Sequence, residues 1–379
     1  MDFHFSEEQE LFRRTAARFA EKEIAPLVDE LEQREEFPVE LLRRMGELGF
    51  LGITYPEKYG GSGGNVTTLC IFLEEVGRIS ASVAIGTAVQ IGGVSGPVFL
   101  FGTEDQKEKY LVPSIKGEKI GAIAMTEPSA GSDTASIHTS AKKGDNGYII
   151  DGAKIFCTNG GIADLYFVTA VTDPKKGIKG ISIFVIERGA SGLMVGKSIR
   201  KLGLHGLGTH EVVFEGCMVD PDSLLGEEDK GFYNLMRSIE RNRIGVAATA
   251  VGLAKAAFDD ALQYAKERVQ FGKPIGMFQG IQFVLADMAV DIELAATMVY
   301  KAAWMDDHGI RCNKEASIVK LYASEMVNRV TYKALQVFGG YGYMMEYPLQ
   351  RYFRDARVFE IFEGTSEIQR VIISRELGL

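Results

Sequence analysis

The pattern of apolar and polar positions changes character twice along the chain. From residue 6 to about 120, apolar residues recur three and four positions apart, the spacing of one helix face. Ser6 with Gln9 three residues later forms a capping box, which predicts a helix start. Pro38 predicts another helix, with proline in its first turn. The helical spacing is clearest at Leu11, Phe12, Ala16, Phe19 and Ala20, and at Leu69, Phe72, Leu73 and Val76.

Short runs of β-branched and aromatic residues replace this spacing between about 121 and 225. Gly, Asp, Asn and Pro separate the runs, as they commonly separate strands. The runs are residues 148–150, 155–157, 165–168, 181–186 and 212–214. Short strands divided by turn residues predict a small sandwich or barrel.

Helical spacing returns from about 226 to the end of the chain. Three long Ala/Leu-rich segments, 244–267, 278–307 and 315–338, are joined by short links, which predicts a bundle. We therefore expect an α+β multidomain protein. Its parts are an N-terminal helical domain (1–120), a middle β-domain (121–225) and a C-terminal helical domain (226–379).

The composition is ordinary for a globular protein, with 46% hydrophobic and 25% charged residues among 379. A net charge of −9 argues against nucleic acid as a main partner. The four cysteines lie far apart and the five histidines lack ligand spacing, so no metal site is predicted. The acidic N-terminus has no signal-peptide character, and we expect no apolar run long enough to span a bilayer. A cytoplasmic protein is the expectation.

Several common catalytic motifs are missing from the sequence. There is no GxGxxG between a strand and a helix, no GxxxxGK[ST], no HExxH and no GxSxG. Nicotinamide enzymes, P-loop enzymes, zinc hydrolases and serine hydrolases are therefore disfavoured.

Glu363 is the candidate catalytic residue. Two apolar residues precede it, and Gly364 after it allows a sharp turn. Ser366 with Gln369 indicates a capping box and a helix that starts at Ser366. In dry surroundings the pKa of Glu363 would rise, as a general base working near neutral pH requires. Taken alone, a glutamate in such a segment is usually a solvated loop carboxylate.

Three further segments carry groups suited to a flat, phosphorylated cofactor. Thr126 and Ser132 lie in a Pro- and Gly-containing turn whose backbone N–H groups could face a phosphate or a ring edge. Phe156 and Thr158 share one face of a strand, so the ring could stack while the hydroxyl bonds an edge. Arg268 could clamp a pyrophosphate. A polar loop, a strand end and a helix C-terminal arginine are the respective alternatives.

In combination, these segments resemble the acyl-CoA dehydrogenase family over nearly the whole chain. The resemblance implies helical N-terminal and C-terminal domains, the latter a four-helix bundle, around a middle β-barrel or sandwich. The strings that carry it are Phe5 to Gln9, Met125 to Pro128, Gly131 to Asp133, Thr158 to Gly160, Arg268 with Phe271 and Gly272, Gln336 with Phe338 to Gly340, and Arg354 and Asp355 through Glu363 to Thr365.

The resemblance also implies bound FAD and a set of residues that contact it. Those residues are Ile123, Met125, Thr126, Gly131, Ser132, Phe156, Thr158, Arg268, Phe271, Gln279, Gln336, Gly339, Gly340, Thr365 and Glu367. It implies that Ser132, Glu240, Arg243 and Gly364 contact the acyl-CoA. A homotetramer, built as a dimer of dimers, would complete the site across a subunit interface.

The chemistry implied by the resemblance is α,β-dehydrogenation of a short- or medium-chain acyl-CoA to a trans-2-enoyl-CoA, as in fatty acid β-oxidation. Glu363 would remove the α-proton while flavin N5 takes the β-hydride, and an electron-transfer flavoprotein would reoxidise the flavin. The alternatives are an acyl-CoA oxidase or other flavoenzyme on the same scaffold, and a catalytically silent binding scaffold.

Asn242 narrows the branch of the family. One branch, which includes isovaleryl-CoA and long-chain enzymes, places its base glutamate at the position that matches 242. This chain has Asn242 there and retains Glu363, so it resembles the short- and medium-chain branch. Branched and cyclic acyl groups stay open as substrates.

Overall fold

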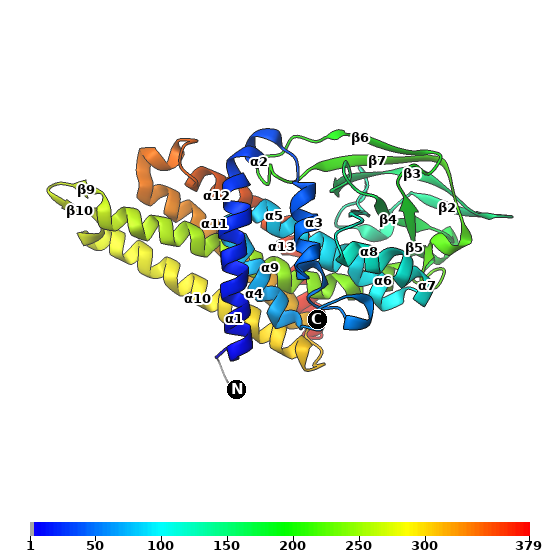
Figure 1. Cartoon of the computed structure of the whole chain (residues 1–379), viewed down its shortest axis with the longest axis horizontal. Helices are drawn as coiled ribbons and strands as arrows, with labels where there is room; N and C mark the ends of the chain where they lie inside the picture. The colour runs from blue at the N-terminus through cyan, green and yellow to red at the C-terminus, as the bar shows by residue number, and fades with distance from the viewer. Residues whose placement is uncertain (1–3) are drawn as a thin grey trace.

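The computed structural model describes residues 4–379; helices form both ends of the chain, and its middle forms a sheet that lies at one end of the molecule (Figure 1). Met1, Asp2 and Phe3, part of the terminus for which the sequence predicts no targeting character, lie outside the described residues. The N-terminal helices are α1 (Glu7–Phe19), α2 (Val28–Arg34), α3 (Val39–Glu47), α4 (Val66–Ile79), α5 (Ala81–Ala88), α6 (Gly96–Phe101), α7 (Glu104–Gln106) and α8 (Val112–Ile115).

Two helix starts predicted from the sequence are confirmed. Ser6 caps α1, with its hydroxyl accepting from the Gln9 N–H while the Gln9 side chain bonds back to the Ser6 N–H. Helix α3 follows Pro38, which occupies the capping position itself.

The stretch Ala81–Phe101 corrects one expectation from the sequence. It is long and apolar enough to cross a membrane by length and composition, although 67% of its most apolar window is buried inside the protein. It comprises α5, the π-helical segment η5 (Val89–Ser95) and α6. Such burial is that of a core helix, so the stretch is weak evidence for a membrane span.

The middle of the chain forms an eight-stranded sheet in the order β6-β7-β3-β2-β4-β5-β8, with β1 pairing parallel to β4. The predicted runs 148–150 and 155–157 belong to the same strand, β3, because bulges bend it without ending it. The strands are β1 (Gly121–Ala124), β2 (Ser140–Gly144), β3 (Gly147–Thr158), β4 (Leu165–Val171), β5 (Ile181–Glu187), β6 (Leu193–Ser198), β7 (Thr209–Val219) and β8 (Leu224–Leu225).

This sheet folds over a core of its own. Strands β2 and β4 pair through Ser140 and Val171 alone, which divides the sheet into two halves. The rings of Tyr148 on β3 and Phe184 on β5 meet edge to face, with centroids 4.9 Å apart. The opposite face of β4 and β5 contributes Phe167 and Val185 to the helical core, so both faces are covered.

The long C-terminal helices are α9 (Gly231–Glu267), α10 (Gln279–Asp307) and α11 (Asn313–Phe338), followed by α12 (Leu349–Ala356) and α13 (Ser366–Glu376). Helix α9 begins well before the predicted residue 244. Helix α4 packs on α9 and α10, and one apolar core joins N-terminal and C-terminal helices. The division into three domains at 120 and 225 therefore stays our proposal.

Candidate functional site

Glu363 is half-buried in the short loop between the 3₁₀ turn η12 (Arg357–Glu360) and α13, and α13 lies among the other helices (Figure 1). Its φ of 52° and the 87° of Gly364 place both residues in the left-handed region. For a residue with a Cβ that conformation costs on the order of 1–2 kcal/mol. The surrounding contacts must therefore hold the loop in place.

The predicted capping box at Ser366 is wrong, although the helix does start there. Thr365 is the N-cap, and its side chain accepts from the Ile368 N–H. The Ser366 hydroxyl has no hydrogen-bond partner in the described part of the chain. Gln369 turns instead toward the loop, donating to the carbonyl oxygens of Glu363 at 3.1 Å and of Gly364 at 2.9 Å.

Burial raises the pKa of the Glu363 carboxyl, opposed by the positive charges of Arg243 and Lys320. Arg243 is buried, and its Nη1 donates to Asn313 Oδ1 at 3.3 Å. Within residues 4–379 its Nε has no partner. Burial lowers the pKa of Arg243, against the pull of Glu363 and Glu240. A carboxylate that is more basic than usual, facing two buried cations, suits proton abstraction from carbon.

The other predicted acyl-CoA residues divide between two places. Glu240, one turn before Arg243 on α9, is half-buried, and burial raises the pKa of its carboxyl. Gly364 adjoins Glu363, and its carbonyl oxygen accepts from Lys320 Nζ at 2.7 Å. Ser132 is exposed and lies in the loop after β1. The structure thus places Arg243 and Gly364 beside the predicted base, with Glu240 next to Arg243.

A buried ion pair anchors the predicted cofactor loop after β1. Lys154 Nζ lies 2.8 Å from Glu127 Oε1 and 3.0 Å from the Met125 carbonyl oxygen. The Ile155 N–H donates to the Thr126 carbonyl oxygen at 2.8 Å, which brings the loop alongside β3. Ile123 on β1 points elsewhere, since its Cδ1 would lie 2.3 Å from a methyl group at Gly93 of η5.

Phe156 and Thr158 stand at the end of β3 next to that loop. A bulge between Lys154 and Cys157 gives Phe156 a φ of 60°. Phe156 is 60% exposed, Cys157 is buried and Thr158 is half-buried. The ring therefore stands free, as a surface for stacking requires.

The remaining predicted cofactor residues gather at the far end of the long helices. Arg268 ends α9 and lies over the Tyr341 ring, 5.4 Å from its centroid. Phe271 is 93% exposed at the turn between β9 (Val269–Gln270) and β10 (Lys273–Pro274). A methyl group at Gly339 or Gly340 would meet no atom within 4 Å. The exposed members of this group also include Gln279 and Gln336.

The first group belongs to β3 and the loop after β1, and the second lies around the β9–β10 hairpin at the ends of the long helices (Figure 1). The β9–β10 hairpin projects from one end and the sheet forms the other. Thr365 and Glu367 lie near Glu363 at the start of α13, which stands between the hairpin and the sheet (Figure 1). One chain therefore does not bring all the predicted cofactor residues together.

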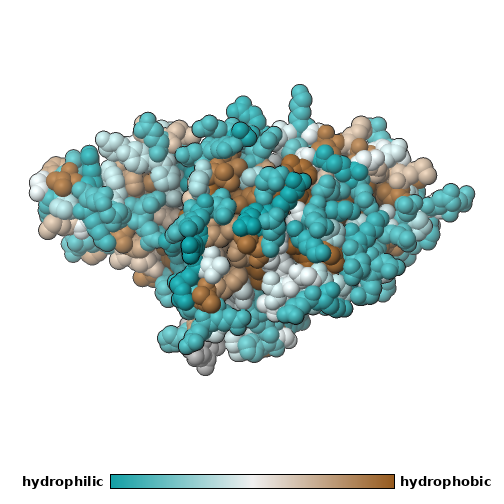
Figure 2. Space-filling view, in the orientation of Figure 1, coloured by the Kyte–Doolittle hydropathy of each residue, from teal (hydrophilic) through white to brown (hydrophobic). Residues whose placement is uncertain are grey.

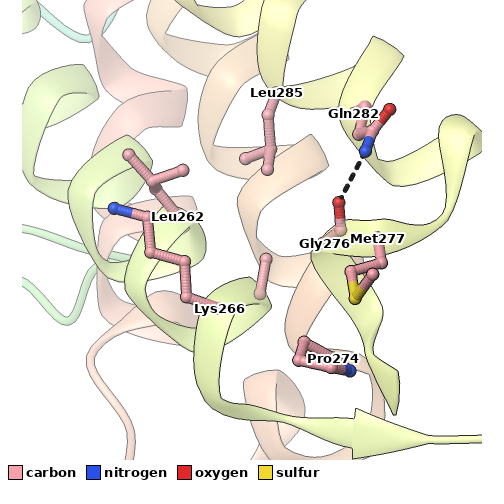
Figure 3. Close-up of a pocket in the computed structure, with 8 residues that line it drawn as sticks. Leu262, Lys266, Pro274, Gly276, Met277, Gln282 and Leu285 are labelled. Carbon is pink, nitrogen blue, oxygen red and sulfur yellow. Dashed lines mark hydrogen bonds between the residues drawn. The ribbon is translucent and has the colours of Figure 1, made fainter.

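A cavity of about 500 Å³ opens beside the hairpin, between the end of α9 and the start of α10 (Figure 3). Gln282 Nε2 donates to the Gly276 carbonyl oxygen at 3.0 Å on its rim. The catalytic candidates lie elsewhere, so this cavity is not the reaction site. Its lining consists of Leu262, Ala265, Lys266, Pro274, Gly276, Met277, Gln282 and Leu285.

Sequence models of the acyl-CoA dehydrogenase N-terminal, middle and C-terminal domains match residues 6–118, 122–217 and 229–378. This chain belongs to the acyl-CoA dehydrogenase family. The expected fold class and the expected class of enzyme, an acyl-CoA dehydrogenase-type oxidoreductase, are thereby confirmed.

Similar proteins cover the chain from end to end. An acyl-CoA dehydrogenase of Bacillus subtilis (strain 168) is 46% identical over 374 residues, 99% of each chain. A subunit of the caffeyl-CoA reductase–Etf complex of Acetobacterium woodii is 44% identical over 374 residues, 98% of each chain. The solved structure of butyryl-CoA dehydrogenase from Megasphaera elsdenii matches with a TM-score of 0.97 and 44% identity, covering 100% of both chains.

Asn242 stands at the position where, by the resemblance, another branch of the family holds a glutamate. Its side chain packs against the backbone of Gly92, which has no side chain of its own. A methyl group at Gly92 would lie 1.8 Å from Asn242 Oδ1. Gly92 belongs to η5, whose wider π-helical turns often mark functional sites. The Asn242 side chain thus occupies the space that the missing Gly92 side chain leaves.

The sequence did not reveal the residues that hold two loops in place, the loop of Glu363 and the predicted cofactor loop after β1. Lys320, Gln369 and Glu127 are buried and bond the loop backbone directly. Lys320 had a sequence signal, because it lies on the apolar stripe of α11 with Ala316 and Ala323. A lysine on such a stripe must find a buried partner.

Proposed function

We propose that this chain oxidises short-chain acyl-CoA thioesters, with Glu363 as the base that removes the α-proton. The observation that carries the proposal is the Glu363 carboxyl itself, whose pKa burial raises while Arg243 and Lys320 face it. A thioester α-proton is weakly acidic, so its removal requires a base of raised pKa and positive charge near the developing enolate.

The residues present fit FAD as the cofactor. Phe156 offers an exposed ring face beside the hydroxyl of Thr158 and the backbone of the Thr126 loop. Gly131, Gly339 and Gly340 leave open space where a side chain would stand, so a ligand can approach their backbone closely. The bound flavin would supply the hydride acceptor. Met125, Ser132, Arg268 and Gln279 would contact other parts of it.

The chain's own groups would prepare the substrate for proton removal. Glu363 presents its half-buried carboxylate beside Arg243 and Lys320, where burial raises its pKa. Arg243 adds positive charge that favours the carboxylate form between reactions. The backbone N–H of Glu363, on the same left-handed loop, would donate to the thioester carbonyl.

A second copy of the chain would complete each cofactor site. The exposed group around Arg268, Phe271 and Gln336 lies by the β9–β10 hairpin, which projects from the end of the molecule away from the sheet that carries Phe156 (Figure 1). Both groups can contact one cofactor if they come from different chains. This supports the homotetramer, a dimer of dimers, that the resemblance implies.

An electron-transfer flavoprotein is the proposed electron acceptor. The similar Acetobacterium protein is a subunit of a reductase–Etf complex.

A location in the cytoplasm stays a prediction from the sequence. On the face of the molecule that Figure 2 shows, hydrophilic side chains predominate, and apolar side chains are exposed in patches between them.

Anaerobic bleaching of the flavin by a panel of acyl-CoAs tests the proposal. We expect butyryl-CoA to bleach the FAD-loaded enzyme fastest, with longer, branched and aromatic thioesters slower. Bleaching followed by fast reoxidation in oxygen with product still bound would indicate an acyl-CoA oxidase instead. No bleaching by any thioester would overturn the proposal in favour of a silent scaffold.

A further inference from the structure

Two buried side chains from different helices hold the loop that carries Glu363. Lys320 Nζ, from α11, donates to the Gly364 carbonyl oxygen at 2.7 Å. Gln369 Nε2, from α13, donates to the same oxygen at 2.9 Å and to the Glu363 carbonyl oxygen at 3.1 Å. Both side chains are fully buried, with 0% exposure. The loop backbone is therefore fixed from behind by a cation and an amide.

This clamp, formed by Lys320 and Gln369, explains how the loop keeps an unfavourable backbone conformation. Glu363 has a φ of 52°, which a residue with a Cβ adopts only when its surroundings enforce it. The two carbonyl oxygens that the clamp holds belong to the two peptide bonds that follow Glu363. Small shifts of these peptides would change where the carboxylate points, and reacting groups tolerate little displacement.

Lys320 also brings a positive charge to the base, which Gln369 does not. The charged groups that face Lys320 are Glu363, Arg243 from α9, Glu360 from η12 and Glu367 from α13. Burial lowers the pKa of Lys320 to about 8, against the opposing pull of Glu363. Lys320 is therefore an ammonium below that pH, and it favours the ionised form of Glu363.

We propose that Lys320 is a positioning residue for proton abstraction. It holds the Glu363–Gly364 loop in its left-handed conformation through the Gly364 carbonyl, and its charge keeps the neighbouring carboxyl ready to accept a proton. The proposal rests on the proposed function, in which Glu363 is the base.

Lys320→Met and Gln369→Met form a matched pair of variants. Each removes a hydrogen bond to the Gly364 carbonyl and keeps a long unbranched side chain, but only Lys320→Met removes a charge. The measurement is the single-turnover rate of flavin reduction by butyryl-CoA in the FAD-loaded enzyme from pH 5 to 8. Up to about pH 7 wild-type Lys320 stays largely charged, because its pKa is about 8, so the acid limb can be compared there.

We expect both variants to reduce the flavin at least about tenfold more slowly, because the base is less well placed. In Lys320→Met the acid limb of the rate profile should also move up by about one pH unit, because a nearby positive charge is lost. Gln369→Met should keep the wild-type limb. Lys320→Arg should return the limb toward the wild-type position.

If the rate of flavin reduction in Lys320→Met is lower but the acid limb stays at the wild-type pH, the charge of Lys320 does not act on the base, and its role is one of packing. A wild-type rate in that variant would contradict the proposal outright. If Lys320→Met does not bind FAD or fold, Lys320→Gln carries the same comparison, because it can still donate but bears no charge. Glu363→Gln is the separate control: a wild-type rate there would remove the base assignment, whatever Lys320 does.

Discussion

Lys154 Nζ lies 2.8 Å from Glu127 Oε1, and both side chains are almost completely buried. The pair joins β3 to the loop that carries Thr126. The Glu127 carboxylate also accepts from the backbone N–H groups of His138 at 2.7 Å and Thr139 at 2.9 Å. Burial raises the pKa of Glu127, but these hydrogen bonds outweigh it and lower the pKa to about 2.

Glu127→Gln should destabilise the protein by about 3 kcal/mol, because it leaves the Lys154 ammonium buried without a counter-charge. Urea unfolding of the FAD-free protein at pH 7 measures this. The matched control is the double variant Glu127→Gln with Lys154→Met, which removes both charges and should recover part of the loss. Equal stability of Glu127→Gln and wild type would contradict the anchoring role of the pair.

The same pair predicts how stability responds to acid. Glu127 has a folded-state pKa of about 2, below the ordinary 4.5, so the folded state binds this proton less readily than the unfolded state. Its contribution is full above pH 4.5 and is lost as the pH falls toward 2. Glu127→Gln should therefore flatten the fall in unfolding free energy across this window. An unchanged slope would show that Glu127 is not specially stabilised.

The pKa of Glu363 shifts in the opposite direction to that of Glu127, and activity should follow it. Burial raises the pKa of this carboxyl above 4.5, and only its carboxylate form can accept the α-proton. We expect kcat/KM to rise with pH along a limb whose midpoint lies above 4.5. Steady-state rates with butyryl-CoA across pH 4.5 to 8 measure it, and a plateau that already begins below pH 4.5 would contradict the burial of the base.

Asn242→Ala should enlarge the space next to η5, because the Asn242 side chain fills the gap above Gly92. We expect the ratio of kcat/KM for hexanoyl-CoA to that for butyryl-CoA to rise about tenfold, the effect of one or two methylene groups in an apolar pocket. Gly92→Ala is the control, since its methyl group would displace Asn242 without adding space. Equal ratios in all three proteins would place Asn242 outside the acyl pocket.

Mixing two inactive variants tests whether a site is shared between chains. Glu363→Gln removes the base, and Arg268→Ala removes a cofactor contact at the far end of α9. In a mixed oligomer, an Arg268→Ala chain supplies Glu363 and a Glu363→Gln chain supplies Arg268 to the same site. Denaturing and refolding the two together should recover about a quarter to a half of the wild-type activity.

The mixing experiment has a different outcome if sites are not shared between chains. If each chain builds its own complete site, the mixture should be no more active than the average of the two variants refolded separately. The double variant, carrying both changes in one chain, gives the background.

Local sequence patterns predicted the fold because they have local physical causes. The Ser6–Gln9 capping box and the turn at the glycine after Glu363 each depend on near neighbours. The long helices followed from apolar spacing alone, although polar residues at 231–243 concealed the true start of α9.

Contacts between distant segments could not be predicted in this way. Lys320 and Gly364 are 44 residues apart, and nothing near either residue indicates their hydrogen bond. Gln369 has the correct spacing for a capping box, but Thr365 takes the cap and leaves Gln369 free to bond the loop. Glu127 meets Lys154 only because β1 and β3 belong to one sheet.

The most direct test of the account is anaerobic flavin reduction in Glu363→Gln. This variant keeps the size of the side chain and its burial but cannot accept the proton. We expect it to bind FAD and butyryl-CoA with near wild-type affinity and to reduce the flavin at least about 10³-fold more slowly, the scale of a lost general base. Flavin reduction at the wild-type rate would contradict the assignment of Glu363 as the base.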